Sequence, residues 1–144
     1  MNRRGFSLIE LLIAIVLIGV LAAFMIPRIG DGIQKQKVRS ARNAITTMHA
    51  RARATAIRRG RLVAFVCRSN RILLLSRHPV TGVPDTIASQ NLAEIFGVTL
   101  STDRDSLAFD ARGLGMESGN TQIVVSRAGF ADTIVISSVG SILR

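Results

Sequence analysis

The apolar and polar residues of this chain follow three patterns along its length. Apolar residues run almost without interruption from Phe6 to Ile26, where Glu10 is the one charged residue. Over residues 33–57 they recur at spacings of three, four and seven, which predicts an amphipathic helix. From Arg61 onward the apolar runs are short and separated by turn residues, which predicts strands. We therefore expect a helical first part and a β-rich second part.

The continuous apolar run is long enough to cross a membrane. At about 1.5 Å per residue, a helix from Phe6 to Ile26 measures roughly 31 Å, close to the bilayer core of about 30 Å. Glu10 would lie about one turn inside that core, where an acidic side chain costs on the order of 2.5 to 3.5 kcal/mol. We therefore expect the carboxylate of Glu10 to have a partner, for which an amine is the candidate.

The amphipathic helix is expected to continue the apolar one and to end at Gly60. Pro27 stands close to Gly30 and Gly32, which predicts a bend or a short melted stretch over residues 27–32. The apolar positions of the amphipathic part are Ile33, Val38, Ala41, Ala44, Ile45, Met48, Ala52 and Ala56.

Short β-rich runs follow, with turn residues between them. A hairpin is predicted around Arg68-Ser69-Asn70, and a loop over residues 78–85, which hold two prolines and a glycine. The predicted strands are residues 62–67, 71–76, 96–100, 106–110, 121–127, 133–138 and 142–143. The expected fold is α+β, with a small antiparallel sheet packed on the amphipathic helix.

The charge of the chain is strongly basic and unevenly distributed. Its formal net charge is +10, and residues 28–77 hold 13 lysines and arginines against one acid, Asp31. This basic belt could bind nucleic-acid phosphates, acidic lipid headgroups or acidic neighbouring subunits. The candidate nucleic-acid surface is Arg51 with the cluster Arg58, Arg59 and Arg61, but no aromatic residues are interleaved for base stacking. We therefore favour a solvated or subunit-facing surface over a nucleic-acid site.

The sequence offers little for catalysis or metal binding. His49 is expected on the surface of the helix and His78 in a loop, and neither has a Cys, Asp or Glu at ligand spacing. Cys67 follows an apolar run, which predicts a buried structural thiol. We expect no enzyme activity, no cofactor and no metal, because no nucleophile, base and orienting residue come together.

Two further segments, residues 113–119 and 102–105, could be interpreted as a ligand or catalytic site or as an ordinary turn. The glycines from Gly113 to Gly119 miss both standard phosphate-loop spacings and are not followed by a long helix, so we expect a turn-rich loop. Asp103 and Asp105 could pair as carboxylates, but with Thr102 and Arg104 they are typical of an exposed turn.

Three ordinary interpretations of the N-terminus compete with a specialised one. A cleavable secretory signal has a shorter apolar run, and a twin-arginine signal lacks an acid in that run, although Arg3 and Arg4 would fit either. The third is a plain membrane anchor carrying a β domain that never polymerises, which leaves Glu10 without a purpose.

The segment Gly5-Phe6-Ser7-Leu8-Ile9-Glu10-Leu11-Leu12 resembles the class III signal of type IV pilins and type II secretion pseudopilins. The resemblance implies that a prepilin peptidase and N-methyltransferase cuts after Gly5 and methylates Phe6. It implies that Glu10 acts in filament assembly and that Pro27 bends the helix. A neighbouring subunit's amine could neutralise Glu10, which would then fix the register between helices.

The second half of the chain resembles the head of the GspH/FimT group of minor pilins and pseudopilins. The resemblance rests on Leu107-Ala108-Phe109-Asp110, Gly113, Gln122-Ile123-Val124-Val125-Ser126, Asp132-Thr133-Ile134-Val135-Ile136 and Gly140. Some related proteins bind DNA through a glycine-arginine motif near the C-terminus, where this chain has Ser141 after Gly140.

The two resemblances together imply an organisation and a location. A cleaved leader occupies residues 1–5, a transmembrane and filament-core helix 6–27, a basic amphipathic helix 28–59, and a β-rich periplasmic head 60–144. The chain would cross the bacterial inner membrane once, with its N-terminus cytoplasmic, and would join other pseudopilins or pilins in a filament. A type II secretion pseudopilus, which the chain would help initiate or cap, is the favoured setting. A type IV pilus with a role in DNA uptake is the alternative.

Overall fold

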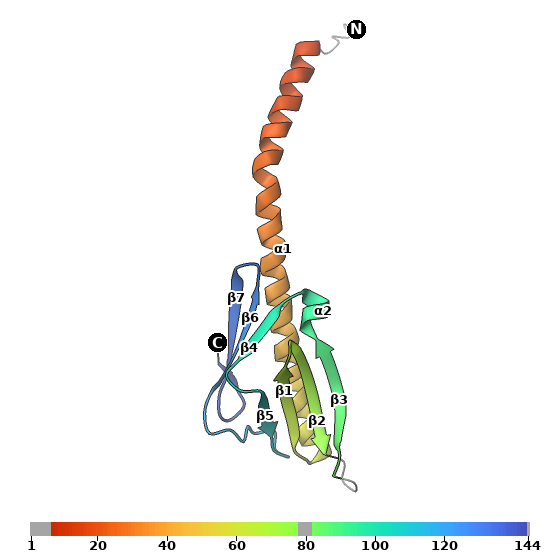
Figure 1. Ribbon diagram of the computed structural model, residues 1–144, viewed down its shortest axis with the longest axis vertical. Coiled ribbons are helices and arrows are strands. Elements are labelled where there is room, and N and C mark those ends of the chain that lie inside the picture. The colour runs from red at the N-terminus through yellow and green to blue at the C-terminus, as the bar shows by residue number, and fades with distance from the viewer. Residues whose placement is uncertain (1–6, 78–81, 144) are drawn as a thin grey trace, which may run out of the picture. The chain divides into compact units, whose positions relative to one another are not determined.

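A computed structural model of the chain describes residues 7–77 and 82–143, apart from the side chains of residues 26–28. The chain divides into two compact units, Met1–Gln34 and Lys35–Arg144. Helix α1, Leu8–Arg59, contributes to both units, and all strands belong to the second. Figure 1 shows the second unit as a set of strands beside the C-terminal part of α1, and we call this unit the head.

Helix α1 is continuous through residues 27–32, so the melted stretch expected there is absent. Pro27 removes one backbone hydrogen-bond donor, and each glycine lowers the stability of the helix by about 1 kcal/mol. The remaining turns of this long helix are sufficient to keep it formed. The bend expected at Pro27 stays a prediction. The helix ends at Arg59, and Gly60, the residue that was expected to end it, follows with a φ of 60°. The Arg61 and Gly60 amides donate to the carbonyls of Ala56 and Ile57, both at 3.2 Å, so the end is a Schellman motif.

The first antiparallel sheet has the strand order β3-β2-β1-β5. Its strands are β1 Val63–Arg68, β2 Arg71–Arg77, β3 Pro84–Asn91 and β5 Ser106–Phe109. Buried and partly buried residues alternate along β1, β2 and β5, as expected of strands with one face on a core. The turn between β1 and β2 places Ser69 and Asn70 at φ values of 50° and 61°, which confirms the predicted hairpin.

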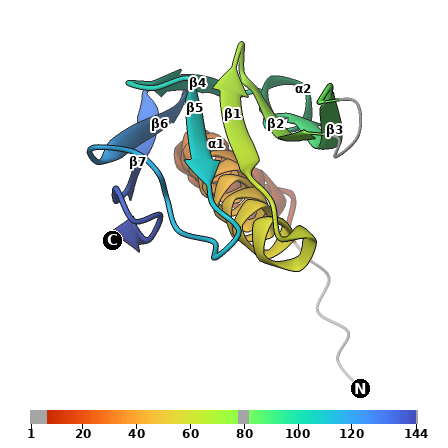
Figure 2. The same cartoon turned by 90° about the horizontal axis from the view of Figure 1, so that it is seen from below.

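The second antiparallel sheet has the order β4-β6-β7-β8. Its strands are β4 Thr99–Thr102, β6 Thr121–Arg127, β7 Phe130–Ile136 and β8 Ile142–Leu143. The short helix α2, Leu92–Phe96, connects β3 to β4 across the two sheets. Seen from below in Figure 2, the strands form an arc along one side of the C-terminal part of α1.

The core of the head lies between α1 and the inner faces of both sheets. Six apolar positions of the helix are buried there, namely Val38, Ala41, Ile45, Met48, Ala52 and Ala56. All six belong to the predicted apolar stripe. The sheets contribute the largest buried side chains, Phe65 and Phe109, together with Ile72, Leu74, Ile123 and Ile134. The expected α+β pilin-like arrangement is thus confirmed, with two sheets where one was predicted.

Several strand boundaries differ from the predicted ones. Strand β3 was not predicted because it is polar and lies at the edge of its sheet, so no apolar alternation marks it. The predicted strand 96–100 is divided by Gly97, which ends α2 in a left-handed conformation before β4 begins. Strand β7 starts at Phe130, earlier than predicted, because the tight turn at Ala128 and Gly129 brings it directly back along β6.

Candidate functional site

The first half of α1 presents an apolar surface that the chain itself does not cover. The large side chains from Leu8 to Met25 are exposed, and this helix is long and apolar enough to cross a membrane. Burying that much apolar surface is strongly favourable, so lipid or other helices must cover it in the working state.

Glu10 lies in the first turn of α1 and has a partner within its own chain. Its Oε2 accepts a hydrogen bond from the Ser7 amide at 3.2 Å, and the Leu11 amide donates to the Ser7 carbonyl at 3.2 Å. Ser7 and Glu10 therefore form one half of a capping box, which stabilises a helix start. The spacing Ser-x-x-Glu is typical of this contact, which was not among the predictions for Glu10; a partner amine in a neighbouring subunit was expected instead.

The other predicted N-terminal residues are only partly within the described structure. Gly5 and Phe6, the expected cleavage and methylation positions, lie outside the described residues. Pro27 lies inside α1, where the backbone is helical on both sides.

The structure places the four arginines of the candidate basic surface at the C-terminal end of α1. Arg51 and Arg58 are exposed and seven residues apart, which puts them on the same face of the helix. Arg59 forms an ion pair of 3.8 Å with Asp85 at the start of β3, and Arg61 follows the helix end. Of the phenylalanines in the described head, all four are buried or partly buried in the core: Phe65, Phe96, Phe109 and Phe130. The described head therefore offers no exposed ring for base stacking.

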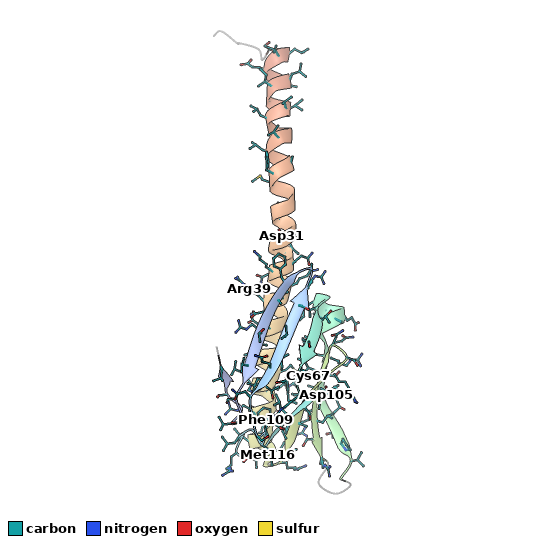
Figure 3. The ribbon with its side chains drawn as sticks, turned by 60° about the vertical axis from the view of Figure 1, so that its left-hand side comes forward. Asp31, Arg39, Cys67, Asp105, Phe109 and Met116 are labelled. Carbon is teal, nitrogen blue, oxygen red and sulfur yellow. The ribbon has the colours of Figure 1, made fainter. Side chains whose placement is uncertain are left out.

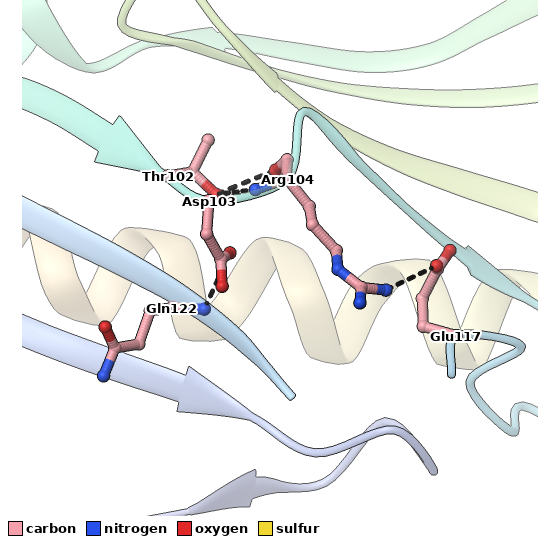
Figure 4. A network of polar contacts seen from close by, with 5 residues as sticks. All are labelled: Thr102, Asp103, Arg104, Glu117 and Gln122. Carbon is pink, nitrogen blue, oxygen red and sulfur yellow. Dashed lines mark hydrogen bonds and ion pairs between the residues drawn. The ribbon is translucent and has the colours of Figure 1, made fainter. Parts of the chain in front are cut away.

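Other arginines hold parts of the head together. Figure 4 shows the turn after β4, where the Thr102 hydroxyl both donates to the Arg104 carbonyl and accepts from its amide. Asp103 accepts from the Gln122 amide at 3.0 Å, and Arg104 pairs with Glu117 at 3.0 Å. This confirms the turn predicted from the sequence and shows that it connects β4, β6 and the loop after β5.

His49 is buried in the core, so the prediction of a helix-surface residue was wrong. His49 is 3% exposed, and its ring meets the rings of Phe109 and Phe65 edge-on, with centroid distances of 5.2 and 6.1 Å. The head covers a wider part of α1 than the predicted stripe, and His49 lies within that wider part. Burial, aided by the charge of Arg53, lowers the pKa of His49 to about 4, so the ring is neutral near pH 7. Its Nε2 has no hydrogen-bond partner among the described residues.

Cys67 is a buried thiol, as predicted. It is the chain's one cysteine, and burial, with a smaller contribution from the charge of Asp105, raises its pKa to about 12. Figure 3 places Cys67 and Asp105 close together within the head. A thiol with so high a pKa is almost entirely protonated at neutral pH and is a poor nucleophile.

The glycine-containing loop after β5 is shaped by Asp110. Its carboxylate accepts hydrogen bonds from the amides of Arg112 and Leu114, each at 2.9 Å, and from the side chain of Arg112 at 2.9 Å. These bonds, the one from Leu114 first, lower the pKa of Asp110. No long helix follows, so the loop is turn-rich as predicted.

No metal site is visible in the part of the chain that the structure describes. Within residues 7–77 and 82–143, no three His, Cys, Asp or Glu side chains gather closely enough to hold an ion. His78 lies outside the described residues.

A long helix with an exposed apolar first half, followed by an antiparallel β head on its second half, defines a pilin-like subunit. Residues 1–26 match the prokaryotic N-terminal methylation motif, and residues 41–140 match the family described as type II transport protein GspH. The chain belongs to this family, which confirms the predicted GspH/FimT-type membership. It is a structural subunit of the minor pseudopilin or pilin type.

Solved structures support the same fold. The chain is similar to the type IV minor pilin FimU of Pseudomonas aeruginosa in two crystal forms. One match has 14% identity and a TM-score of 0.63, covering 76% of this chain and 88% of that protein. The other has 16% identity and a TM-score of 0.58, covering 73% and 90%. No curated protein matches this chain.

Proposed function

We propose that this chain is a minor pseudopilin of a type II secretion system that helps initiate or cap a periplasmic pseudopilus. The observation that carries the proposal is the match of residues 41–140 to the type II transport protein GspH family. The match of residues 1–26 to the methylation motif supports processing by a prepilin peptidase and assembly with other pilin-type subunits.

Processing would prepare the N-terminus for assembly. Cleavage after Gly5 removes Arg3 and Arg4 and leaves Phe6 as the methylated N-terminal residue. Before cleavage, these arginines would hold the N-terminus in the cytoplasm of a protein inserted in the inner membrane, and the head would be periplasmic. After cleavage, a cationic amine stands at the start of an apolar helix.

The carboxylate of Glu10 would then bind the terminal amine of a neighbouring subunit. Among the residues that the structure describes, the Glu10 carboxylate accepts a hydrogen bond from the neutral amide of Ser7 at 3.2 Å. An ammonium group is a stronger partner for a carboxylate in apolar surroundings, and a buried carboxylate without it is destabilised by several kcal/mol. Only one stagger between helices brings each amine to a Glu10, so the pair would select the register. Pro27 would bend the helix beyond that region.

The processing step is tested by co-expressing the full chain with a prepilin peptidase and measuring the N-terminal peptide by mass spectrometry. We expect a peptide that starts at methylated Phe6, and an uncut peptide from a Gly5→Val variant. An uncut wild-type chain would contradict the proposal and favour a membrane-anchored β domain that does not polymerise.

A type IV pilus is the second candidate setting, favoured by the resemblance of the fold to a type IV minor pilin. Deleting the gene separates the two settings, because a pseudopilin affects protein secretion and a minor pilin affects surface pili. A DNA-uptake role would require the arginines near the end of α1 to bind duplex DNA. A mobility-shift assay of the full chain in detergent at low salt tests this, with Arg51→Ser and Arg58→Ser as the variants.

A further inference from the structure

Three segments that are distant in the sequence meet where α1 ends. The Arg53 side chain donates to the Gly113 carbonyl at 2.9 Å, and the Ile57 side chain lies directly against Gly113. The Gly115 amide donates to the Val139 carbonyl at 3.0 Å. The end of α1, the loop after β5 and the turn after β7 are therefore in contact, at the end of the head where Figure 3 labels Met116.

Each of the three contacting segments carries large apolar side chains that are exposed. Ile57 is 55% exposed, Leu114 41%, Met116 60% and Val139 57%. We call these four residues the end patch. Single exposed apolar residues are common on proteins, but a cluster drawn from three contacting segments is typical of an interaction surface.

The end patch is held in a fixed shape before any partner binds. Asp110 fixes the loop by accepting from the Leu114 amide at 2.9 Å, and the Met116 amide bonds the Ala108 carbonyl at 3.0 Å. Gly115 lies so close to the neighbouring turn that an added Cβ would stand 2.5 Å from the Ser138 carbonyl oxygen. A preorganised surface loses little conformational entropy when it binds, which favours affinity.

Positive charge surrounds the end patch. In the described segments 53–61, 110–117 and 137–143, the charged residues are Arg53, Arg58, Arg59, Arg61, Arg112, Asp110 and Glu117. Both carboxylates are paired with arginines, Asp110 with Arg112 and Glu117 with Arg104, and Arg59 pairs with Asp85 of β3. The excess positive charge of these segments therefore comes from Arg53, Arg58 and Arg61. The surface therefore has an apolar centre and a cationic rim, and its complement is an apolar surface that carries carboxylates.

We propose that the end patch is the docking surface for a different pilin-type subunit, one whose contacting face is apolar and rich in carboxylates. The proposal rests on the proposed function, which supplies other pilin-type subunits as neighbours. A second copy of this chain fits poorly, because joining two such ends would bring two cationic rims together. DNA also fits poorly, because phosphates gain nothing from exposed Leu114, Met116 and Val139, and no exposed ring is present in the described head.

The test co-expresses the tagged full chain with the prepilin peptidase and, one at a time, each other prepilin-type subunit of the same system. Retained subunit is measured after purification in detergent. The disruptive variant carries Leu114→Asp and Val139→Asp together. The matched control is Ile95→Asp, because Ile95 is equally apolar and 55% exposed but lies on α2, at the other end of the head in Figure 1.

We expect the wild-type chain and the Ile95→Asp variant to retain one acidic subunit equally. The double variant should retain less than about one tenth of the amount of that subunit that the wild-type chain retains, as expected when central interface residues are lost. All three proteins should unfold at similar temperatures, because the changed side chains are exposed. Arg58→Glu should weaken retention by a smaller factor that shrinks at high salt.

Retention by the double variant at the wild-type level would overturn the inference, as would an equal loss in Ile95→Asp. Self-association through this end, or DNA binding that the double variant abolishes, would also overturn it. If the wild-type chain is trimmed at Gly5 and holds a subunit that the double variant also holds, only the end patch is refuted. If the wild-type chain is neither trimmed nor bound to any subunit, the proposed function fails as well.

Discussion

The two halves of α1 use apolar residues for different purposes. In the second half, Val38, Ala41 and Ile45 are buried against the sheets, so they stabilise the head of a single chain. In the first half, residues such as Leu12 and Leu17 are exposed. The hydrophobic effect is the same in both halves, but only the second half gains from it before the chain meets lipid or other subunits.

The largest contrast between the halves should appear in alanine substitutions. Phe65 is fully buried, so Phe65→Ala should lower the free energy of unfolding of the head by about 3 to 5 kcal/mol. Leu17→Ala, which removes an exposed side chain, should change it by less than about 0.5 kcal/mol. Chemical denaturation of both variants in detergent measures the difference, and a similar loss in the two variants would remove the distinction.

The next effect concerns pH and belongs to the second half of α1 alone. The pKa of His49 falls from 6.5 in the unfolded chain to about 4 in the folded one. Because the pKa of His49 is lower in the folded chain, the unfolded chain binds the proton at a higher pH as the pH falls. The stabilisation is therefore complete above pH 6.5, is lost as the pH falls toward 4, and amounts to about 3 kcal/mol.

Urea denaturation at several pH values checks this prediction. Comparing wild type with His49→Leu removes the contribution of carboxylates that titrate in the same range. We expect the difference in unfolding free energy between the two proteins to change through the window from pH 6.5 to 4. A constant difference would contradict the neutral, buried ring.

Glycine substitutions at the end of the head should have intermediate effects. Gly115→Ala would place its Cβ 2.5 Å from the Ser138 carbonyl oxygen, so we expect a loss of about 2 kcal/mol or more. Gly60→Ala meets no atom within 4 Å but must adopt a φ of 60°, which costs about 1 kcal/mol. The order of the two melting temperatures tests whether the loop after β5 is as tightly packed as the geometry indicates.

The smallest effect is expected at an ion pair between α1 and β7. Arg42 and Asp132 lie 3.2 Å apart and both side chains are about one third exposed. Solvent screens such pairs, so a double-mutant cycle with Arg42→Met and Asp132→Asn should give a coupling below about 1 kcal/mol. A coupling of several kcal/mol would contradict this prediction, because the ion pair would then stabilise the head as much as a buried apolar side chain does.

The sequence predicted the parts of the fold that repeat a strong pattern. Helix α1 and strands β1, β2 and β6 each bury one face. Because the buried face must be apolar, apolar residues recur along the sequence with the period of a helix or a strand. The helix end at Gly60 was predictable because a left-handed residue there favours glycine. Strand β3 was not predictable, because an edge strand with two half-exposed faces leaves no alternation.

The site could be predicted only where local spacing decides it. The eight residues from Gly5 to Leu12 predicted the methylation motif that residues 1–26 match, while cleavage at Gly5 and methylation of Phe6 stay predictions. The Ser7-x-x-Glu10 spacing is also typical of the capping contact that the structure shows. The burial of His49 and the meeting of Ile57, Leu114 and Val139 depend on how distant segments pack. No local pattern encodes that packing, so these features came from the structure.

Competition between wild-type and Glu10→Gln subunits in the same cells tests the central claim, that the first half of α1 works only in assembly. Glutamine can still accept from the Ser7 amide, but it carries no charge for a neighbour's amine. We expect wild-type subunits to outnumber Glu10→Gln subunits by more than about tenfold in filaments purified from these cells. The two heads should melt at the same temperature. Equal incorporation of the two subunits would contradict the claim.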